Sequence, residues 1–509
     1  SINVLKLTTN NYLSFSRQIG NNHNLEAIAG MTFENVERDL HWIQATGFPT
    51  DAFQTIASAT TASAFTSEES AFAYLSYFAR ANYKLMDKYL LTASVRYDGS
   101  SRFGINNRYG VFPAASVGWI MSRENFLQNA NWLSFLKLRG SYGIVGNSGI
   151  GNYDHLGTYR GADYAGTSGI RPWTLASPDL KWENTTQYDI GIDFGLIRNR
   201  INGELDYYYK KTTDLLLART LPSTSGFTSV TENVGSLENK GWELVINTSN
   251  LVGQFKWNTS FNISQNRNKV LDINGPDIIV AENRVREGEP IGVFVTRSYA
   301  GVNPDNGHAI YYLENGETTD DYNIAPNLVV GSPNPDFVGG MTNTFTFKGF
   351  DLNILLSYVY GNSVYNGGGQ WQSSNSSGWL DNQTKNQLNR WQKPGDITDV
   401  PQAVFLGNEF SGTNASSRYL HDASYLRLRS VSFGYSLPSS VVERMKLRSL
   451  RIYASATNLF TWTSYEGWDP EVNFLGTNYS TTTINISQGQ DFYTAPQART
   501  ITVGITVGL

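Results

Sequence analysis

The sequence lacks cysteine altogether and contains only five histidines among its 509 residues. Without cysteine, the chain can form neither a disulfide framework nor a thiolate metal site. The histidines lie far apart, and none has the i, i+2 or i, i+4 spacing of paired metal ligands: they are His23, His41, His155, His308 and His421. We therefore expect no metal site and no cofactor, and structural or solvent-exposed roles for the histidines.

Charge is also scarce, at 16% of the residues, and the net charge is −5. This balance argues against nucleic-acid binding, which relies on lysine and arginine clustered on one face. No apolar run approaches the roughly 18 residues of a transmembrane helix. The mean hydropathy of −0.33 does not exclude a membrane β-barrel, because the polar, lumen-facing half of each strand offsets the apolar half.

Aromatic residues, by contrast, are abundant, with 29 Tyr, 26 Phe and 12 Trp. This content suits the aromatic girdles that flank the apolar band of a membrane barrel. Carbohydrate-binding β-sandwiches are also rich in Tyr and Trp. The aromatic content alone therefore leaves both classes open.

Residues 185–210, TTQYDIGIDFGLIRNRINGELDYYYK, alternate between apolar and polar side chains along two arms. A β-strand points successive side chains to opposite faces, so each arm has one apolar face and one polar face. The short corner at Arg198 and Asn199 predicts an antiparallel hairpin. Each arm has about ten residues, which matches a tilted strand that crosses a bilayer. A soluble sheet hairpin also fits this stretch when it is taken alone.

The same alternation recurs along the chain, with short corners on one side and long polar excursions on the other. It predicts about 14 to 16 antiparallel strands. One closed sheet, an all-β antiparallel transmembrane β-barrel, explains them better than several sandwiches, because closure removes unpaired strand edges. In YLRLRSVSFGYSL the apolar parity switches near Arg429 and Ser430, which predicts a β-bulge or an exit from the membrane. Residues 266–335 lack alternation, and we expect a long irregular region there.

Catalytic chemistry is not indicated by any motif. Asp189 and Asp193 fall on the polar face of one strand, where contact with a wet lumen explains them. A catalytic carboxylate pair would need a shielded site. GNSGIG at residues 146–151 lacks the lysine and the strand–loop–helix context of a phosphate loop. We therefore expect no catalytic residue and no enzyme.

Seven stretches, spread over nearly the whole chain, resemble the SusC/RagA-type TonB-dependent outer-membrane transporters in the order of that family. They are LLTASVRYDGSSRFGINNRYGVFPAASVGW (residues 90–119), LSFLKLRGSYGIVGNSGIGNY (133–153), SPDLKWENTTQYDIGIDFG (177–195), NVGSLENKGWEL (233–244), GSPNPDFVGGMTNTFTFKGFDL (331–352), RYLHDASYLRLRSVSFGYSLP (418–438) and YEGWDPEV (465–472). The acidic, glycine-rich stretch that members often carry before GSPNPDF is here only ENGETTDDYN. The resemblance therefore brings no metal site to that stretch.

The resemblance implies a barrel of about 22 strands filled by an N-terminal plug. It also implies a SusD-like lipoprotein lid, energy from the TonB complex and a place in the bacterial outer membrane as a multi-pass β-barrel. A dimer of transporter–lid pairs is a further assembly that it allows. Residues 1–7, SINVLKL, lack the features of a signal peptide, which an exported protein requires. We expect residues 1–509 to be the C-terminal barrel part with long extracellular loops, and the plug and the segment that contacts TonB to lie upstream.

The function that follows from the resemblance is TonB-dependent import of nutrient oligomers, either glycans or peptides, together with the lid. One alternative is a passive outer-membrane porin, complete in itself with the predicted 14 to 16 strands. A second is a secreted carbohydrate-binding β protein. A porin would need neither a partner protein nor energy coupling. A secreted carbohydrate-binding protein would not need a membrane.

The polar excursion at residues 365–414 holds the candidate residues for contact with substrate or lid. They are Trp371, Trp379, Trp391, Tyr365 and Gln372. Indole rings stack on sugar rings, but the same rings also anchor plain loops. Asn and Gln side chains supply paired donors and acceptors that suit either glycans or peptide backbones. These residues therefore mark a candidate outer mouth, together with the loop at residues 146–184, without choosing the cargo.

Overall fold

The structure is a computed structural model that describes residues 1–373, 382–404, 410–474 and 486–509. The fold is all-β, as the alternation predicts. In the described ranges, the longest helix is α1 (Gly367–Gln372), with 6 residues. None of the helices in these ranges has the length and apolarity needed to cross a membrane.

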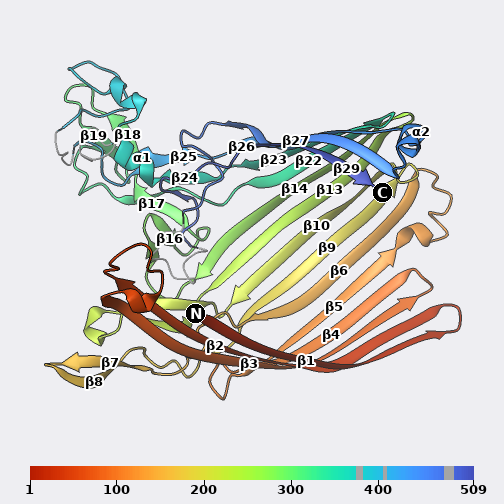
Figure 1. The fold of residues 1–509 in the computed structure, drawn as a ribbon, viewed down its shortest axis with the longest axis horizontal. Coiled ribbons are helices and arrows are strands. Elements are labelled where there is room, and N and C mark those ends of the chain that lie inside the picture. The colour runs from red at the N-terminus through yellow and green to blue at the C-terminus, as the bar shows by residue number, and fades with distance from the viewer. Residues whose placement is uncertain (374–381, 405–409, 475–485) are drawn as a thin grey trace. The chain divides into compact units, whose positions relative to one another are not determined.

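Within the described residues, the main sheet has 15 hydrogen-bonded strands, which agrees with the predicted 14 to 16 (Figure 1). All of them follow chain order. In order they are β1 (Ile2–Ile19), β2 (His23–Thr46), β3 (Thr61–Leu85), β4 (Tyr89–Ser100), β5 (Tyr109–Ile120), β6 (Leu133–Asn147), β9 (Glu183–Leu196), β10 (Ile201–Thr213), β13 (Ser236–Val252), β14 (Phe255–Asp272), β22 (Phe337–Phe347), β23 (Phe350–Tyr360), β26 (Tyr425–Ser436), β27 (Ser449–Thr463) and β29 (Thr500–Gly508). Neighbouring strands pair antiparallel, as β1 with β2 and β27 with β29 do.

The chain divides into two compact units, and the first comprises residues 1–120, 139–189 and 210–236. Its strands β2 and β3 have 24 and 25 residues. A tilted strand needs only about 9 to 11 residues to cross a bilayer, so these strands extend beyond it. Outside the main sheet this unit adds η1 (Ile56–Ser58), the hairpin β7 (Tyr159–Tyr164) and β8 (Thr167–Pro172), η3 (Ser223–Ser225), and the pair β11 (Leu216–Thr220) and β12 (Ser229–Asn233).

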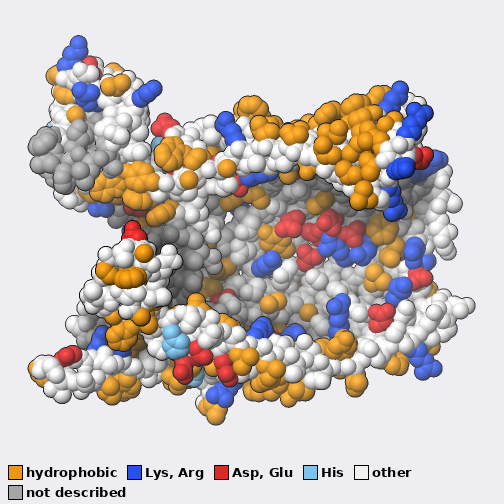
Figure 2. Space-filling view, in the orientation of Figure 1, with side chains coloured by type: hydrophobic (Ala, Val, Ile, Leu, Met, Phe, Trp, Pro, Cys, Tyr) orange, Lys and Arg blue, Asp and Glu red, His pale blue; other side chains and the backbone are white. Residues whose placement is uncertain are grey.

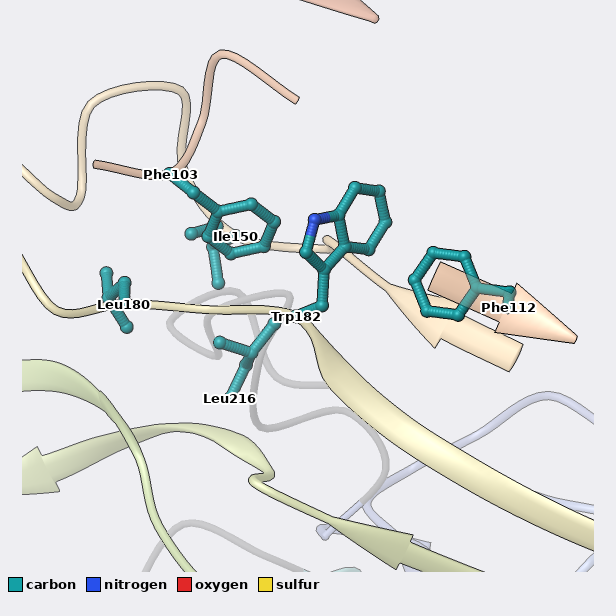
Figure 3. Close-up of a cluster of buried hydrophobic side chains, with 6 residues drawn as sticks. All are labelled: Phe103, Phe112, Ile150, Leu180, Trp182 and Leu216. Atoms are coloured by element: carbon teal, nitrogen blue, oxygen red, sulfur yellow. The ribbon is translucent and has the colours of Figure 1, made fainter. Parts of the chain in front are cut away.

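A small apolar core ties the loops of the first unit together (Figure 3). Trp182, just before β9, lies between Phe103, after β4, and Phe112 on β5, with ring centroids 5.2 and 5.3 Å away. Its indole Nε1–H donates to the carbonyl oxygen of Arg108 at 2.9 Å. Ile150 and Leu180 complete the cluster together with Leu216 of β11. Several of the stretches quoted above therefore meet in one core, which fixes the loops that carry them.

The second unit comprises residues 121–138, 190–209 and 237–509. The predicted corner of the β9–β10 hairpin lies here, where Arg198 and Asn199 take left-handed backbone conformations. On β9, Ile190 is 68% exposed, whereas Asp193 on the opposite face pairs with Lys137 at 2.9 Å. Apolar side chains thus face outward and charged side chains pair on the inner face, which is the arrangement of a strand between lipid and a wet lumen.

The end of the second unit shows the same arrangement on β27 and β29, where Figure 2 shows hydrophobic side chains gathered. Ile501, Val503 and Ile505 of β29 are 74%, 73% and 64% exposed. The predicted bulge on β26 is confirmed, because the register with both neighbouring strands shifts at Arg429, between Leu428 and Ser430. The bulge is where the apolar parity of the sequence switches.

The expectation of an irregular region at residues 266–335 is wrong. This region holds β15 (Ile278–Val280), β16 (Asn283–Val285), β17 (Val293–Arg297), β18 (Tyr299–Val302), β19 (Ala309–Tyr312), β20 (Thr318–Thr319) and β21 (Asn327–Gly331). They form two small sheets, β15-β16-β17-β21 and β18-β19-β20. The strands have 2 to 5 residues, too few for an alternation to stand out.

A third small sheet, β25-β24-β28, lies in the same unit. It contains β24 (Ser363–Asn366), β25 (Leu420–Asp422) and β28 (Gln490–Asp491). The remaining short elements are α1, α2 (Ser439–Val442), η2 (Met121–Arg123), η4 (Lys385–Asn389), η5 (Ser417–Tyr419) and η6 (Glu443–Met445). We call residues 278–331, 363–373, 382–404 and 410–422 the loop region. Its core includes Phe294, Tyr365 and Tyr419, which are at most 2% exposed.

Candidate functional site

The loop region and residues 466–468 line a polar, partly open cavity of about 430 Å³, which we call the mouth cavity. Its lining includes Gln372 of α1 and Thr384 just before η4. Arg418 of η5, His421 of β25 and Trp468 also line it. Residues that are more than 100 positions apart in the chain therefore face one space. Such a concave site with a few directed polar groups is the usual form of a ligand pocket.

Two hydrogen bonds hold α1 and the segment before η4 in place at the mouth cavity. The Asn366 side-chain Oδ1 caps α1 by accepting a hydrogen bond from the Gly369 N–H at 2.6 Å. The Thr384 N–H donates to the carbonyl oxygen of Gln372 at 2.9 Å. The two segments that carry the Gln372 and Thr384 side chains are thereby joined, so these side chains project from a fixed support.

Tyr299, Arg418 and Tyr419 also line the mouth cavity. The Tyr299 hydroxyl donates to the carbonyl oxygen of Asp399 at 2.7 Å, and Arg418 Nη1 donates to that of Gly412 at 3.0 Å. Burial raises the pKa of both Tyr299 and Tyr419 above the usual range of tyrosine. Both hydroxyls therefore stay neutral and act as hydrogen-bonding groups rather than as charges.

The charges that face the mouth cavity are of both signs. Arg418 supplies a guanidinium, and Asp399 and Glu466 supply carboxylates. Burial lowers the pKa of His421, while the neighbouring Glu466 raises it to a smaller extent. His421 is therefore neutral near pH 7 and offers one donor and one acceptor. The cavity suits an uncharged or zwitterionic polar ligand better than a strongly charged one.

The candidate residues from the sequence fall in different places. Gln372 lines the mouth cavity. Trp371 is 50% exposed and Tyr365 is 1% exposed, and neither lines the cavity. Trp391 donates its Nε1–H to the carbonyl oxygen of Pro304 at 2.9 Å. Trp379 lies outside the described residues.

The sequence reasoning missed several lining residues, chiefly Arg418, His421, Glu466 and Trp468. Each lies in one of the quoted family stretches, RYLHDASYLRLRS or YEGWDPEV. That membership was the only available signal, because nothing in their spacing shows that they converge. Across the described ranges, no group of three or more His, Cys, Asp or Glu side chains is placed to hold a metal ion.

Comparison with known proteins identifies the family. The family model described as "TonB dependent receptor-like, beta-barrel" matches residues 3–459. TonB-dependent receptor P3 of Formosa agariphila is 33% identical over 539 residues, which cover 99% of this chain and 52% of that protein. TonB-dependent receptor SusC of Bacteroides thetaiotaomicron is 33% identical over 431 residues, which cover 78% of this chain and 41% of that protein.

Solved structures agree with this match. The structure of the RagAB peptide transporter superimposes with a TM-score of 0.89 at 27% identity, covering 100% of this chain and 56% of that one. The RagAB peptide importer in its "closed-closed" state also gives a TM-score of 0.89, at 28% identity. The chain spans about half the length of the curated relatives it matches. The chain belongs to the TonB-dependent receptor β-barrel family, in its SusC/RagA-type branch, and is an outer-membrane β-barrel protein.

Proposed function

We propose that this chain supplies barrel strands and extracellular loops to an energy-coupled importer of nutrient oligomers, and that the mouth cavity receives the cargo. The observation that carries the proposal is the mouth cavity itself. It is polar, it is built on the loop region, and it belongs to a unit whose main-sheet strands are apolar on the outside and polar on the inside. A transporter requires both features, a ligand site and a wall between lipid and a polar lumen. An enzymatic role has no support in this arrangement.

The proposed partners are the TonB complex and a SusD-like surface lipoprotein, which would cover the mouth. Family membership supports the first, since TonB appears in the names of the curated relatives. The similarity to RagAB supports a transporter function, because RagAB is a peptide transporter, or peptide importer. Closing a mouth during import prevents leakage, so a lid has a physical purpose.

The cargo we propose is a short glycan or a short peptide. The mouth cavity offers the amide of Gln372, the hydroxyl of Thr384 and the imidazole of His421, all of which can both donate and accept. Sugar hydroxyls and peptide backbones need such paired groups. A volume of about 430 Å³ holds a few sugar or amino-acid residues rather than a whole polymer.

The test is uptake by cells that carry the complete protein. We expect deletion of its gene to abolish growth on one oligomer class, with either a mixed peptide digest or a mixed oligosaccharide ladder as the sole nutrient. Loss of the proton-motive force should abolish uptake as well, because energy coupling distinguishes an importer from a porin. Uptake that continues without energy would contradict the proposal. Unchanged growth of the deletion strain on both mixtures would also contradict it.

A further inference from the structure

Trp468 lines three cavities of the second unit, and two of them are large. One is the mouth cavity. The other, of about 550 Å³, lies against β26 and β27 and is lined by Arg427, Asn458 and Thr461 among others. We call it the wall cavity. Gly467 lines the first and Asp469 the second, so residues 465–471, the strap, pass from one cavity to the other at Trp468.

The C-terminal half of the strap is anchored to β26 by buried charges. Asp469 pairs with Arg427, whose side chain is 1% exposed. The same carboxylate accepts hydrogen bonds from the N–H groups of Glu471 and Gln497, both at 2.9 Å. Glu471 pairs with Arg427 at 2.9 Å and with Arg429 at 2.8 Å. Removing one partner of a buried ion pair leaves an uncompensated charge in the protein interior. The Asp469–Arg427 pair therefore attaches the strap firmly to β26.

The N-terminal half of the strap is equally constrained. The Tyr465 hydroxyl donates to the Asp491 carboxylate at 2.7 Å in a buried contact. At Gly467 a Cβ atom would overlap the Tyr465 ring, so the backbone packs closely against that ring. Tyr465 and Asp469 are 6% and 5% exposed, whereas Trp468 between them is 67% exposed. These contacts hold the backbone of the strap in place, and the Trp468 ring projects from it at the border of the two cavities.

This ring contributes little to any core, and an exposed indole on a fixed support is well suited to contact a solute. Trp offers a large, rigid surface at low cost in conformational entropy, because it has only two side-chain torsions. We propose that Trp468 is the partition between the mouth and wall cavities, and that it selects cargo with a flat face, such as a sugar ring, proline or an aromatic side chain. This inference rests on the proposed import function and assigns a specificity-determining residue to it.

The test uses thiol accessibility, for which the absence of cysteine from residues 1–509 is an advantage. In the complete transporter, freed of any other cysteine, Thr461→Cys places a thiol in the wall cavity and Thr384→Cys places one in the mouth cavity. Intact cells are treated with a membrane-impermeant methanethiosulfonate reagent. We expect Thr384→Cys to react fast and Thr461→Cys slowly.

Adding Trp468→Ala should raise the reaction rate of Thr461→Cys by about tenfold or more and leave that of Thr384→Cys unchanged. Trp468→Phe should preserve most of the difference. Trp371→Ala is the matched control, because Trp371 is also well exposed but lines neither cavity. It should change neither rate.

Equal rates at Thr461→Cys with and without Trp468 would overturn the proposal, since reagent would then reach the wall cavity by another route. A parallel increase at Thr384→Cys would also overturn it, because the strap itself would have collapsed. The assay contains no cargo and needs no energy coupling. A failure of import with the partition intact would therefore count against the proposed function alone.

Discussion

Two strands of the second unit place similar apolar residues in opposite environments. On β29, Ile501, Val503 and Ile505 are 74%, 73% and 64% exposed. On β17 in the loop region, Val293, Phe294 and Val295 are 1%, 0% and 2% exposed. On β29 the apolar residues alternate with threonine and glycine, whereas on β17 they are consecutive.

The difference shows which solvent each region is built for. Consecutive apolar residues are typical of a strand that is buried on both faces, as in the core of a water-soluble domain. Alternation with an exposed apolar face is typical of a strand between lipid and a polar lumen. β17 is therefore part of a core like that of a domain in water, whereas β29 has the pattern of a strand that faces lipid.

The largest effect is expected where β26 anchors the strap next to the loop region. Arg427→Ala leaves the buried Asp469 carboxylate without its cationic partner, which should cost about 3 to 5 kcal/mol of local stability. Arg429→Ala is the control, because Arg429 is 28% exposed and pairs with Glu471, which is itself 38% exposed. Hydrogen exchange of residues 465–474 in the purified transporter measures both. Equal protection in the two variants would show that the buried pair does not anchor the strap.

The lipid-facing character of β29 is tested next. Ile505→Arg places a charge on the outward face and should cost about 2 to 4 kcal/mol if this position lies near the bilayer midplane. Thr502→Arg is the control on the opposite face, where its register partner is Ser455. Thr506 is less suitable, because it lies opposite Arg451 and a second arginine would add like-charge repulsion. The measurement is the assembled fraction in outer membranes, and equal losses would contradict the face assignment.

A valine pair compares the two regions with one and the same substitution. Val295→Ala should cost about 2 to 3 kcal/mol, because buried methyl groups are lost and a cavity remains. Val503→Ala should cost about 0.5 kcal/mol or less, since lipid fills the space. Limited proteolysis of the loop region reports the first effect, and the assembled fraction of the transporter reports the second. Equal sensitivity at both sites would remove the distinction between the regions.

The smallest effect is a pH dependence at the mouth cavity. Burial lowers the pKa of His421 in the folded state. The neutral ring therefore contributes local stability above the unfolded-state pKa of about 6.5, and this stability is lost as the pH falls through the lowered folded-state value. Corrected hydrogen exchange of residues 417–422 should show less protection at acidic pH, and His421→Gln should remove this change. A pH response that persists in His421→Gln would assign it to another group.

The main sheet could be predicted from sequence because lipid on one side and water on the other impose a period of two over long strands. The switch of apolar parity near Arg429 also predicted the β-bulge on β26. The loop region could not be predicted in the same way, because its strands are short and β17 is buried on both faces. Gln372 was found as a polar residue in a long excursion, but its neighbours in the cavity, Arg418 and Trp468, come from distant segments. Tertiary packing brings these residues together, and their spacing in the sequence does not indicate that they line one cavity.

The central claim is that cargo occupies the mouth cavity, and site-specific photo-crosslinking tests it most directly. A photoreactive phenylalanine analogue replaces Thr384, which lines the cavity, or Ile397, which belongs to the same loop region, is 89% exposed and does not line it. Cells that carry the complete transporter are irradiated during uptake of a peptide digest or an oligosaccharide ladder. The account predicts crosslinked oligomer at position 384 and none at 397, and crosslinks at 397 alone or at neither position would contradict it.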